Sequence, residues 1–207
     1  MADRIPLAFG KSMSGAATSI DEMQAVDKIP AAYLTAQPPN LYGTYAARPA
    51  ANAVPANSLY AASDTKEIYL SNGTAWSRVG ISSARIASAE RTTPYSTTSS
   101  SVAAVPGMSL QIVATEVPAG VQFGGTMNYG STSATGLMGL FCDGSQIGQI
   151  LVGITNYTSY SAYATLPAKT PGSLVNLEIR ASSSNNSSVF NIFGDPTDRP
   201  YIRVVSN

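Results

Sequence analysis

The chain has 207 residues, twelve basic and twelve acidic side chains, and no histidine. This length is sufficient to bury a hydrophobic core, and the balanced charge provides no basic footprint for nucleic acid or an anionic membrane. Charged residues make up 12% of the chain, about half the usual share. No apolar stretch reaches the roughly 18 residues of a membrane span. We therefore expect neither a nucleic-acid partner nor a membrane, and a surface that interacts through hydroxyls, amides and backbone.

The residues that usually carry catalysis or bind metal are scarce. Without histidine the Ser/His and Cys/His arrangements and the common zinc sites are excluded. The single cysteine, Cys142, lies in an apolar run, which predicts a packed small side chain. Asp195 and Asp198 favour a turn over a calcium site or a pair of glycosidase carboxylates. The sequence predicts no catalytic residue, no cofactor and no metal, and hence a protein that is not an enzyme.

Residues 1–57 predict an extended arm. They show no periodic apolar face, and the Ala/Pro/Asn stretch 46–57 should form an extended connector, because each proline biases the preceding residue away from helix. Residues 1–10 lack the charged start and apolar core of a signal peptide. We therefore expect synthesis in the cytoplasm and ordering of the arm by a partner.

Residues 58–80 predict a small module of three antiparallel strands. Asp64-Thr65 and Asn72-Gly73 are turn signals, and the second is a strong hairpin signal. The aromatic side chains that would form its miniature core are Tyr60, Tyr69 and Trp76. The three strands are expected at about 59–62, 67–70 and 75–79.

Residues 81–101 predict a linker, since eight of the ten residues from 92 to 101 are Ser or Thr. Residues 102–207 predict a β-sandwich of jelly-roll type. The clearest strand is 175–181, in which apolar and polar residues alternate with period two. The eight strands are expected at about 108–115, 120–129, 135–142, 146–154, 158–165, 173–181, 188–193 and 200–206.

Three tyrosines stand out among small polar residues: Tyr157, Tyr160 and Tyr163. A tyrosine ring can stack on the face of a sugar while its hydroxyl donates and accepts hydrogen bonds. The same residues would equally serve packing within the sandwich or against a neighbouring subunit. Both interpretations, a ligand contact and a subunit contact, stay open at this point.

Two segments resemble structural proteins of tailed bacteriophages. Residues 59–79 look like a small β-module of such proteins, with aromatic strands, an Asp-Thr turn, an Asn-Gly turn and then Trp. Residues 20–34 are similar to a short attachment segment near the N-termini of phage fibre and baseplate-associated proteins, although Val26 stands where a glycine commonly precedes the aspartate. The resemblance implies an anchoring segment that includes Ile29, Pro30, Tyr33 and Leu34.

The C-terminal region resembles the trimeric jelly-roll tips of phage fibres and of tumour-necrosis-factor-like proteins, through the order of its strands. Segments 117–120, 141–144 and 199–204 carry this likeness. It implies a virion protein, made in the host cytoplasm, that docks on capsid, tail or baseplate proteins as a decoration or short fibre. The alternative is a receptor-binding, lectin-like tip that recognises a host surface glycan.

We also expect a homotrimer. Strands 149–154 and 189–193 are apolar on both faces, and residues 92–207 contain only nine charged side chains. A monomer would expose larger apolar patches than soluble monomers usually do, and closed symmetry hides such a surface. The choice of three copies follows from the resemblance alone.

Overall fold

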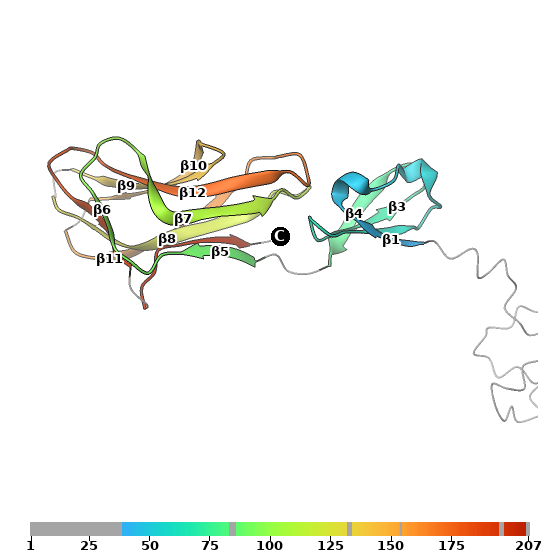
Figure 1. Ribbon diagram of the computed structural model, residues 1–207, viewed down its shortest axis with the longest axis horizontal. Coiled ribbons are helices and arrows are strands. Elements are labelled where there is room, and N and C mark those ends of the chain that lie inside the picture. The colour runs from blue at the N-terminus through green and yellow to red at the C-terminus, as the bar shows by residue number, and fades with distance from the viewer. Residues whose placement is uncertain (1–38, 83–85, 132–133, 154, 195–196, 206–207) are drawn as a thin grey trace, which may run out of the picture. The chain divides into compact units, whose positions relative to one another are not determined.

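A computed structural model describes residues 39–82, 86–131, 134–153, 155–194 and 197–205 (Figure 1). The chain divides into residues 1–39 and 40–207, and every described strand lies in the second unit. That unit is mainly β and contains a small module followed by a β-sandwich. The anchoring residues Ile29, Pro30, Tyr33 and Leu34 lie outside the described residues.

The module is a four-stranded sheet, one strand more than the sequence predicted. Strands β2 (Leu59–Ala62), β3 (Glu67–Ser71) and β4 (Trp76–Ile81) are antiparallel, and β1 (Asn40–Gly43) adds a parallel strand beside β2. The prediction missed β1 because a parallel pairing leaves no hairpin signal in the sequence. The proposed arm therefore ends before residue 40.

Residues 45–57 belong to the module, and the prediction of an extended connector was wrong. They form two 3₁₀ turns, η3 (Tyr45–Ala47) and η4 (Ala51–Ala53), which lie on one side of the sheet in Figure 1. Hydrogen bonds from the sheet hold this segment. The Trp76 indole donates to Pro49 O at 2.8 Å, the Tyr60 hydroxyl to Thr44 O at 2.6 Å, and the Ser71 hydroxyl to Ala51 O at 3.2 Å.

Beneath these turns lies the small core of the module. Tyr60 and Tyr69 are buried, whereas Trp76 is half-buried and packs against them. The Arg48 guanidinium stacks on the Tyr69 ring at 4.1 Å, a favourable cation–π geometry. Tyr69, rather than Trp76, is the central side chain of this core.

The two turns are built as the sequence predicts. The Asp64 carboxylate accepts hydrogen bonds from the backbone N–H groups of Thr65 and Tyr45 at 2.9 and 2.8 Å. The Asn72 amide oxygen accepts from Thr74 N and Ala75 N at 2.9 and 2.7 Å, and Gly73 takes the positive φ of 88° that the turn requires. In both turns of the module, side-chain oxygens thus accept the hydrogen bonds of backbone N–H groups.

The state of Tyr69 should make the module sensitive to alkali. Burial raises the pKa of Tyr69 far above its ordinary value, and the hydrogen bond to the Glu67 carboxylate raises it further. The pKa of Tyr69 is therefore higher in the folded than in the unfolded chain. Its contribution to the free energy of unfolding is fully present below about pH 10, and above that pH the free energy of unfolding falls by about 1.4 kcal/mol per pH unit. We expect urea midpoints, followed by Trp76 fluorescence, to drop above pH 10.

Two variants separate this effect from general alkaline damage. Tyr69→Phe should flatten the decline, leaving the smaller contribution of Tyr60, whose pKa burial also raises. Tyr42→Phe changes a tyrosine that is 77% exposed and should leave the decline unchanged. An unaltered slope in Tyr69→Phe would contradict the assignment.

The sandwich consists of two sheets, and all eight strands predicted within residues 102–207 are present. The smaller sheet has the order β10-β9-β12-β7, with β7 (Ala103–Val113), β9 (Gly136–Cys142), β10 (Ser145–Val152) and β12 (Leu174–Ser183). The larger sheet contains β8 (Gly120–Tyr129), β11 (Thr158–Thr165), β13 (Phe190–Ile192) and β14 (Tyr201–Val205), together with β5 and β6.

Strands β5 (Ile86–Glu90) and β6 (Tyr95–Thr97) correct the prediction that residues 81–101 are a linker. β5 pairs with β14 and β6 with β13, so each extends the larger sheet. Serine and threonine fit here because their hydroxyls bond across strands, as Ser96 Oγ does to Asn191 Oδ1 at 2.7 Å. Tyr95 packs against the core.

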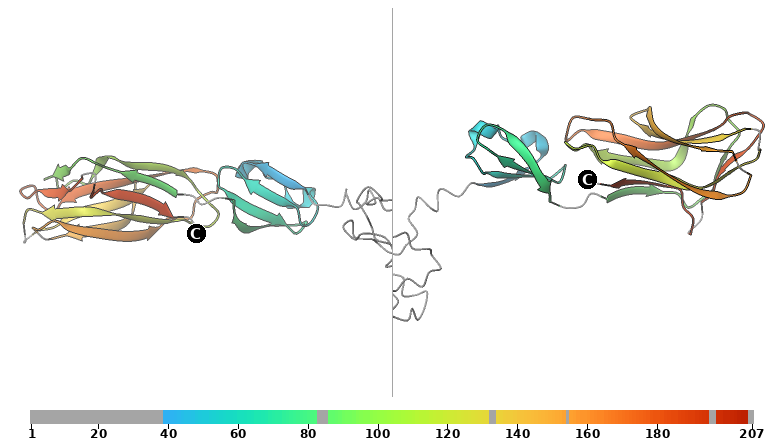
Figure 2. Two further views of the ribbon diagram at one scale, coloured as in Figure 1. Left: turned by 90° about the horizontal axis from the view of Figure 1, so that it is seen from below. Right: turned by 180° about the vertical axis from the view of Figure 1, so that it is seen from behind.

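Taken together, β5/β6 and β13/β14 each act as one interrupted strand, which gives eight strands in two four-strand layers. Along the chain the strands alternate between the sheets, except for the β9–β10 hairpin. This is the connectivity of a jelly roll. The left view of Figure 2 looks onto the larger sheet.

The core lies between the two sheets. β8 contributes buried Phe123, Met127 and Tyr129, which face Leu140 of β9 and Leu177 of β12 in one continuous cluster. On β12 the predicted alternation holds, with the buried residues Val175, Leu177, Ile179 and Ala181. Cys142 is buried in the same core, and this burial raises the pKa of its thiol. Its reactivity should therefore be low.

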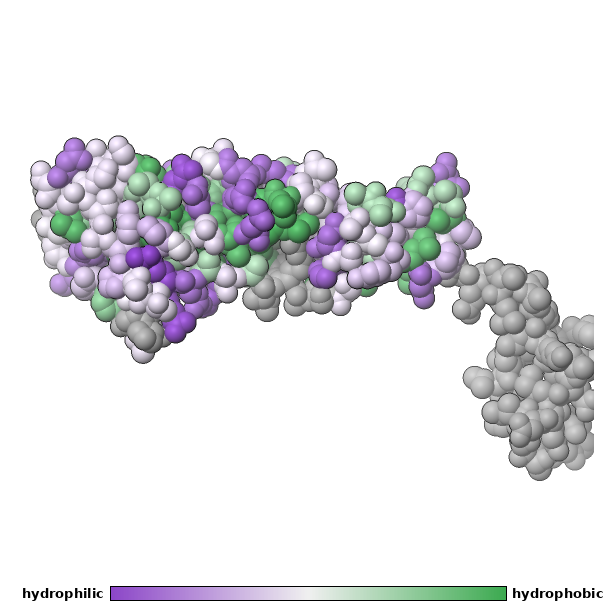
Figure 3. Space-filling model, viewed as in Figure 1, coloured by the Kyte–Doolittle hydropathy of each residue, from purple (hydrophilic) through white to green (hydrophobic). Residues whose placement is uncertain are grey.

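Most of the jelly-roll surface visible in Figure 3 has intermediate hydropathy, as expected from so few charged residues. Figure 3 also shows a hydrophobic patch on the jelly roll. Leu174, at the start of β12, is 61% exposed and pairs in register with Val113 at the end of β7. Within the described residues no helix is long and apolar enough to cross a membrane.

Candidate functional site

The outer face of the larger sheet carries two of the three tyrosines that the sequence singled out near β11, Tyr157 and Tyr163; we call it the tyrosine face. It comprises the outward residues of β5, β14, β8 and β11, with β13 and β6 at one end. On β11 the outward residues are Ser159, Ser161, Tyr163 and Thr165. The residues between them, Tyr160, Ala162 and Ala164, face the core.

The three predicted tyrosines therefore do not form one cluster. Tyr160 packs against the core, whereas Tyr163 is 60% exposed and Tyr157, just before β11, is 54% exposed. Tyr157 and Tyr163 are six residues apart, which corresponds to about 20 Å along an extended strand. Tyr160 lies three residues from each of them. Because the side chains of a strand alternate between its two faces, Tyr160 must point to the opposite face.

Backbone register aligns the outward residues in rows across the sheet. One row contains Tyr163, Gln122 and Arg203, and the next contains Ser161 and Tyr201. Ser161 Oγ lies 3.0 Å from Gln122 Nε2 and 3.1 Å from the Tyr201 hydroxyl, both of which donate to it. The Ser161 hydroxyl thus links β11 to β8 and β14 by hydrogen bonds on the outer surface.

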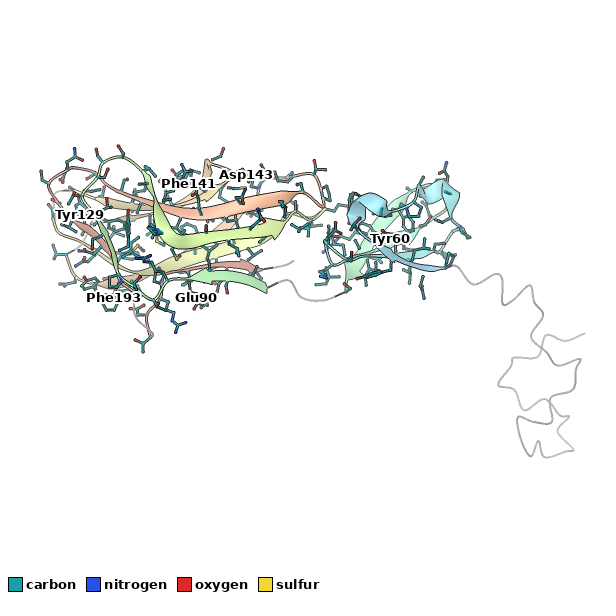
Figure 4. All side chains as sticks on the ribbon, in the orientation of Figure 1. Tyr60, Glu90, Tyr129, Phe141, Asp143 and Phe193 are labelled. Carbon is teal, nitrogen blue, oxygen red and sulfur yellow. The ribbon has the colours of Figure 1, made fainter. Side chains whose placement is uncertain are left out.

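At the other end of the tyrosine face an amide row crosses three strands. Ser96 Oγ donates to Asn191 Oδ1 at 2.7 Å, and Asn191 Nδ2 donates to Asn128 Oδ1 at 2.9 Å. Beside this row the rings of Tyr157 and Phe193 pack at 5.3 Å between centroids. Figure 4 shows Phe193 and Glu90 along this sheet, with Phe141 and Asp143 on the opposite one.

Charge on this face is confined to its β5–β14 edge. Glu90 pairs with Arg203 at 3.1 Å and with Arg199 at 3.3 Å, and the Arg203 guanidinium lies 4.5 Å from the Tyr201 ring. The hydrogen bond from Arg203, and then that from Arg199, lower the pKa of Glu90. The outward side chains of β8 and β11 are all uncharged.

The described residues contain no group of three or more Cys, Asp or Glu side chains able to hold a metal ion. Asp143 binds Lys169 at 2.8 Å and accepts a bond from Asn176 N at 2.9 Å, and these partners lower its pKa. It therefore stabilises a turn. Asp195 lies outside the described residues.

No protein-family model and no curated protein matches the chain. Among solved structures it is similar to a CBM36-1 domain of a multidomain xylanase from the hindgut metagenome of Trinervitermes trinervoides. The two share 10% identity over 59% of this chain and 98% of that domain, with a TM-score of 0.35.

Two further solved structures are similar at the same low level. Dimeric latent PorU from Porphyromonas gingivalis shares 14% identity over 59% of this chain and 12% of that chain, with a TM-score of 0.39. VP2 in the subviral particle of infectious bursal disease virus shares 10% over 64% of this chain and 40% of that chain, with a TM-score of 0.28. Likenesses at this level carry no argument about what the chain does.

Proposed function

We propose that the chain is a non-enzymatic structural component of a bacteriophage virion, a capsid decoration or a short fibre. In this proposal the N-terminal arm, with Ile29, Pro30, Tyr33 and Leu34, docks on a capsid, tail or baseplate protein. The jelly roll projects outward as a homotrimer. Support comes from the phage-like patterns in residues 20–34 and 59–79 and from the jelly-roll strand order.

The composition of the tyrosine face is the observation that supports the proposed self-association. Its central strands β8 and β11 present hydroxyls, amides and the exposed ring of Tyr163, whereas Glu90 and Arg203 lie at its edge. Protein interfaces have this pattern, since charges are depleted at their cores and aromatic residues are enriched there. A sheet face without central charges fits packing against other copies of itself.

The self-association is tested by sedimentation velocity on the full-length chain. We expect a trimer at micromolar concentration, and expect Ser161→Glu to dissociate it, because like charges brought together cost several kcal/mol. Ser109→Glu is the matched control, an exposed serine on β7 of the opposite sheet. A wild-type monomer, or equal behaviour of both variants, contradicts the assembly, and a dimer contradicts the threefold symmetry.

The virion assignment is tested by locating the protein on particles. Gold-labelled antibodies against the full chain should bind intact phage particles, and their position distinguishes a head decoration from a tail fibre. Particles that lack the protein would exclude a virion component.

A second candidate function is recognition of a host surface glycan by the same domain. It is favoured by the exposed ring of Tyr157, which packs in a tilted geometry against Phe193, beside the amides of Asn128 and Asn191. Aromatic rings with adjacent hydrogen-bonding groups suit a sugar that has an apolar face and several hydroxyls. Tyr160 has no part in this site, because it faces the core.

Binding of the full-length chain to a glycan array and to host polysaccharide tests this second function. Tyr157→Ala should abolish binding, and Tyr42→Ala, which removes an exposed tyrosine of the module, should not. No binding by the wild type, or undiminished binding by Tyr157→Ala, would rule the function out.

A further inference from the structure

The end of the tyrosine face at β6 and β13 carries a row of uncharged hydrogen-bonding side chains beside an aromatic pair. We call it the amide end; its members are Ser96, Asn191, Asn128, Tyr157 and Phe193. Pairing of Ser96 with Asn191, and of Asn191 with Asn128, aligns the row across β6, β13 and β8. Because Thr158 pairs with Met127, the same register places Tyr157 beside Asn128.

The hydrogen bonds of this row run in one direction. Ser96 Oγ donates to Asn191 Oδ1 at 2.7 Å, and Asn191 Nδ2 donates to Asn128 Oδ1 at 2.9 Å. Asn128 Nδ2 in turn donates to Thr155 O at 2.9 Å. A backbone carbonyl can only accept, so Asn128 must present its nitrogen to Thr155, and the orientation of Asn191 follows from that of Asn128. Both amides are thus held in one orientation before any ligand binds, which lowers the cost of binding.

Each amide of the row retains one N–H group after these bonds are made. An asparagine side chain has two N–H groups, and among the described residues Asn128 and Asn191 each use one. Both side chains are half-buried, and the ring of Tyr157 beside them is exposed. A sugar fits this combination, because its hydroxyl or acetamido oxygens accept from the two N–H groups while its apolar face packs on the ring.

No charged side chain belongs to the amide end among the described residues. The arginines of the larger sheet make their bonds elsewhere. Arg199 and Arg203 pair with Glu90, and the Arg91 guanidinium donates to three backbone carbonyls. The row of Glu90 crosses β8 at Gly124, four residues from the amide row, which is about 13 Å along the strand. Within the described residues the amide end therefore offers a ligand hydrogen bonds and an aromatic ring but no counter-charge.

We infer that the amide end selects uncharged sugars, namely neutral hexoses and N-acetylhexosamines, over acidic ones. The carboxylate of a uronic or sialic acid loses hydration on binding, and neutral amides offset this loss less well than an arginine fork does. A neutral sugar needs no counter-charge. This inference rests on the second candidate function, glycan recognition, and not on the proposed self-association.

Pairs of glycans that differ in charge test the selectivity of the full-length chain. Polygalacturonate with its methyl ester, and sialylated glycans with their desialylated forms, are suitable pairs on the glycan array. We expect the neutral member to bind about tenfold or more tightly than the acidic one. We also expect this affinity to stay constant as salt rises from about 0.05 to 0.5 M, because no charge pair is screened.

The result distinguishes this selectivity from glycan recognition itself. Equal or tighter binding of the acidic members, or neutral binding that salt weakens, overturns the selectivity and leaves glycan recognition standing. If the wild type binds no glycan on the array and no host polysaccharide, glycan recognition fails and the selectivity fails with it.

Asn128→Asp tests the contribution of the amide row. The change keeps the size and the acceptor oxygen of the side chain but removes its N–H groups. We expect the affinity for neutral glycans to fall about tenfold or more, because the row loses its bond to Thr155 O and a donor for the sugar. Asn176→Asp is the matched control, an exposed asparagine on β12 of the opposite sheet, and should bind like the wild type. Undiminished binding by Asn128→Asp, or an equal loss in both variants, contradicts the role of the row.

Ser96→Arg is a second variant, in which a guanidinium is added at the exposed start of the row. Because a guanidinium pairs with a carboxylate through two parallel hydrogen bonds, the acidic members should gain affinity in this variant, and this gain should disappear at high salt. Circular dichroism of both variants shows that the jelly roll stays folded. An unchanged preference in folded Ser96→Arg would contradict the assignment of the selectivity to the missing counter-charge.

Discussion

Replacing Glu67 by alanine is expected to unfold the module while leaving the jelly roll folded. The carboxylate is fully buried, accepts the Tyr69 hydroxyl at 2.7 Å, pairs with Arg78 at 2.9 Å and accepts Glu116 N at 3.2 Å. Its removal takes this acceptor away from a partly buried cation and from two donors. Breaking a buried ion pair in this way typically costs about 3–5 kcal/mol, which is comparable to the whole stability expected of a small module.

The chain provides its own local reporter for this experiment. Trp76 is the only tryptophan and lies in the module, where its indole donates to Pro49 O. In Glu67→Ala we expect the fluorescence of a water-exposed indole before urea is added, with the far-ultraviolet circular dichroism of the sandwich retained.

The matched control is Glu178→Ala, because Glu178 pairs with Arg180 at the surface of β12, where both side chains are about a quarter to a third exposed. Surface pairs contribute about 0–1 kcal/mol, so this variant should unfold close to the wild type. A module that stays folded in Glu67→Ala would show that the buried pair contributes little net stability.

The eight strands of residues 102–207 could be predicted because each has its own local signal. Alternation on β12 and the Asp143-Gly144 turn before β10 are properties of neighbouring residues. Strands β5 and β6 have no such signal. They are strands because Ser88 pairs with Arg203 and Ser96 pairs with Asn191, residues near the C-terminal end of the chain. Such long-range pairings cannot be predicted from the local composition.

The candidate site was predicted in part. A period of two applied to residues 157–163 places Tyr160 on the face opposite to Tyr157 and Tyr163, and Tyr160 does pack within the sandwich, one of the alternatives that the sequence left open. Phe193 and Tyr201 were not predictable, because only the folded sheet brings them beside Tyr157 and Ser161. Similarly, the 3₁₀ turns near Pro49 exist because Trp76 and Ser71 supply hydrogen bonds from later in the sequence.

Phe123→Ala is expected to have the largest effect on the jelly roll. Phe123 is fully buried on β8, where its backbone neighbours are Ala162 of β11 and Ile202 of β14. Packing around the ring is tight, since a Cβ on Gly148 would lie only 2.9 Å from Cε1. Truncation of a buried phenylalanine leaves a cavity and costs about 3–5 kcal/mol, a large part of the roughly 5–15 kcal/mol that typically holds a domain folded.

Urea denaturation followed by circular dichroism measures this loss, with Phe193→Ala as the control. Phe193 is half-buried on the tyrosine face and packs mainly on Tyr157, so its loss should cost about 0.5–1.5 kcal/mol for the aromatic pair together with a small loss of buried area. Trp76 fluorescence in Phe123→Ala then reports whether the module follows. We expect its midpoint to stay near the wild-type value, because the aromatic core of the module is separate from that of the sandwich. A joint shift of both midpoints would show that the Glu67–Glu116 link makes module and jelly roll one cooperative unit.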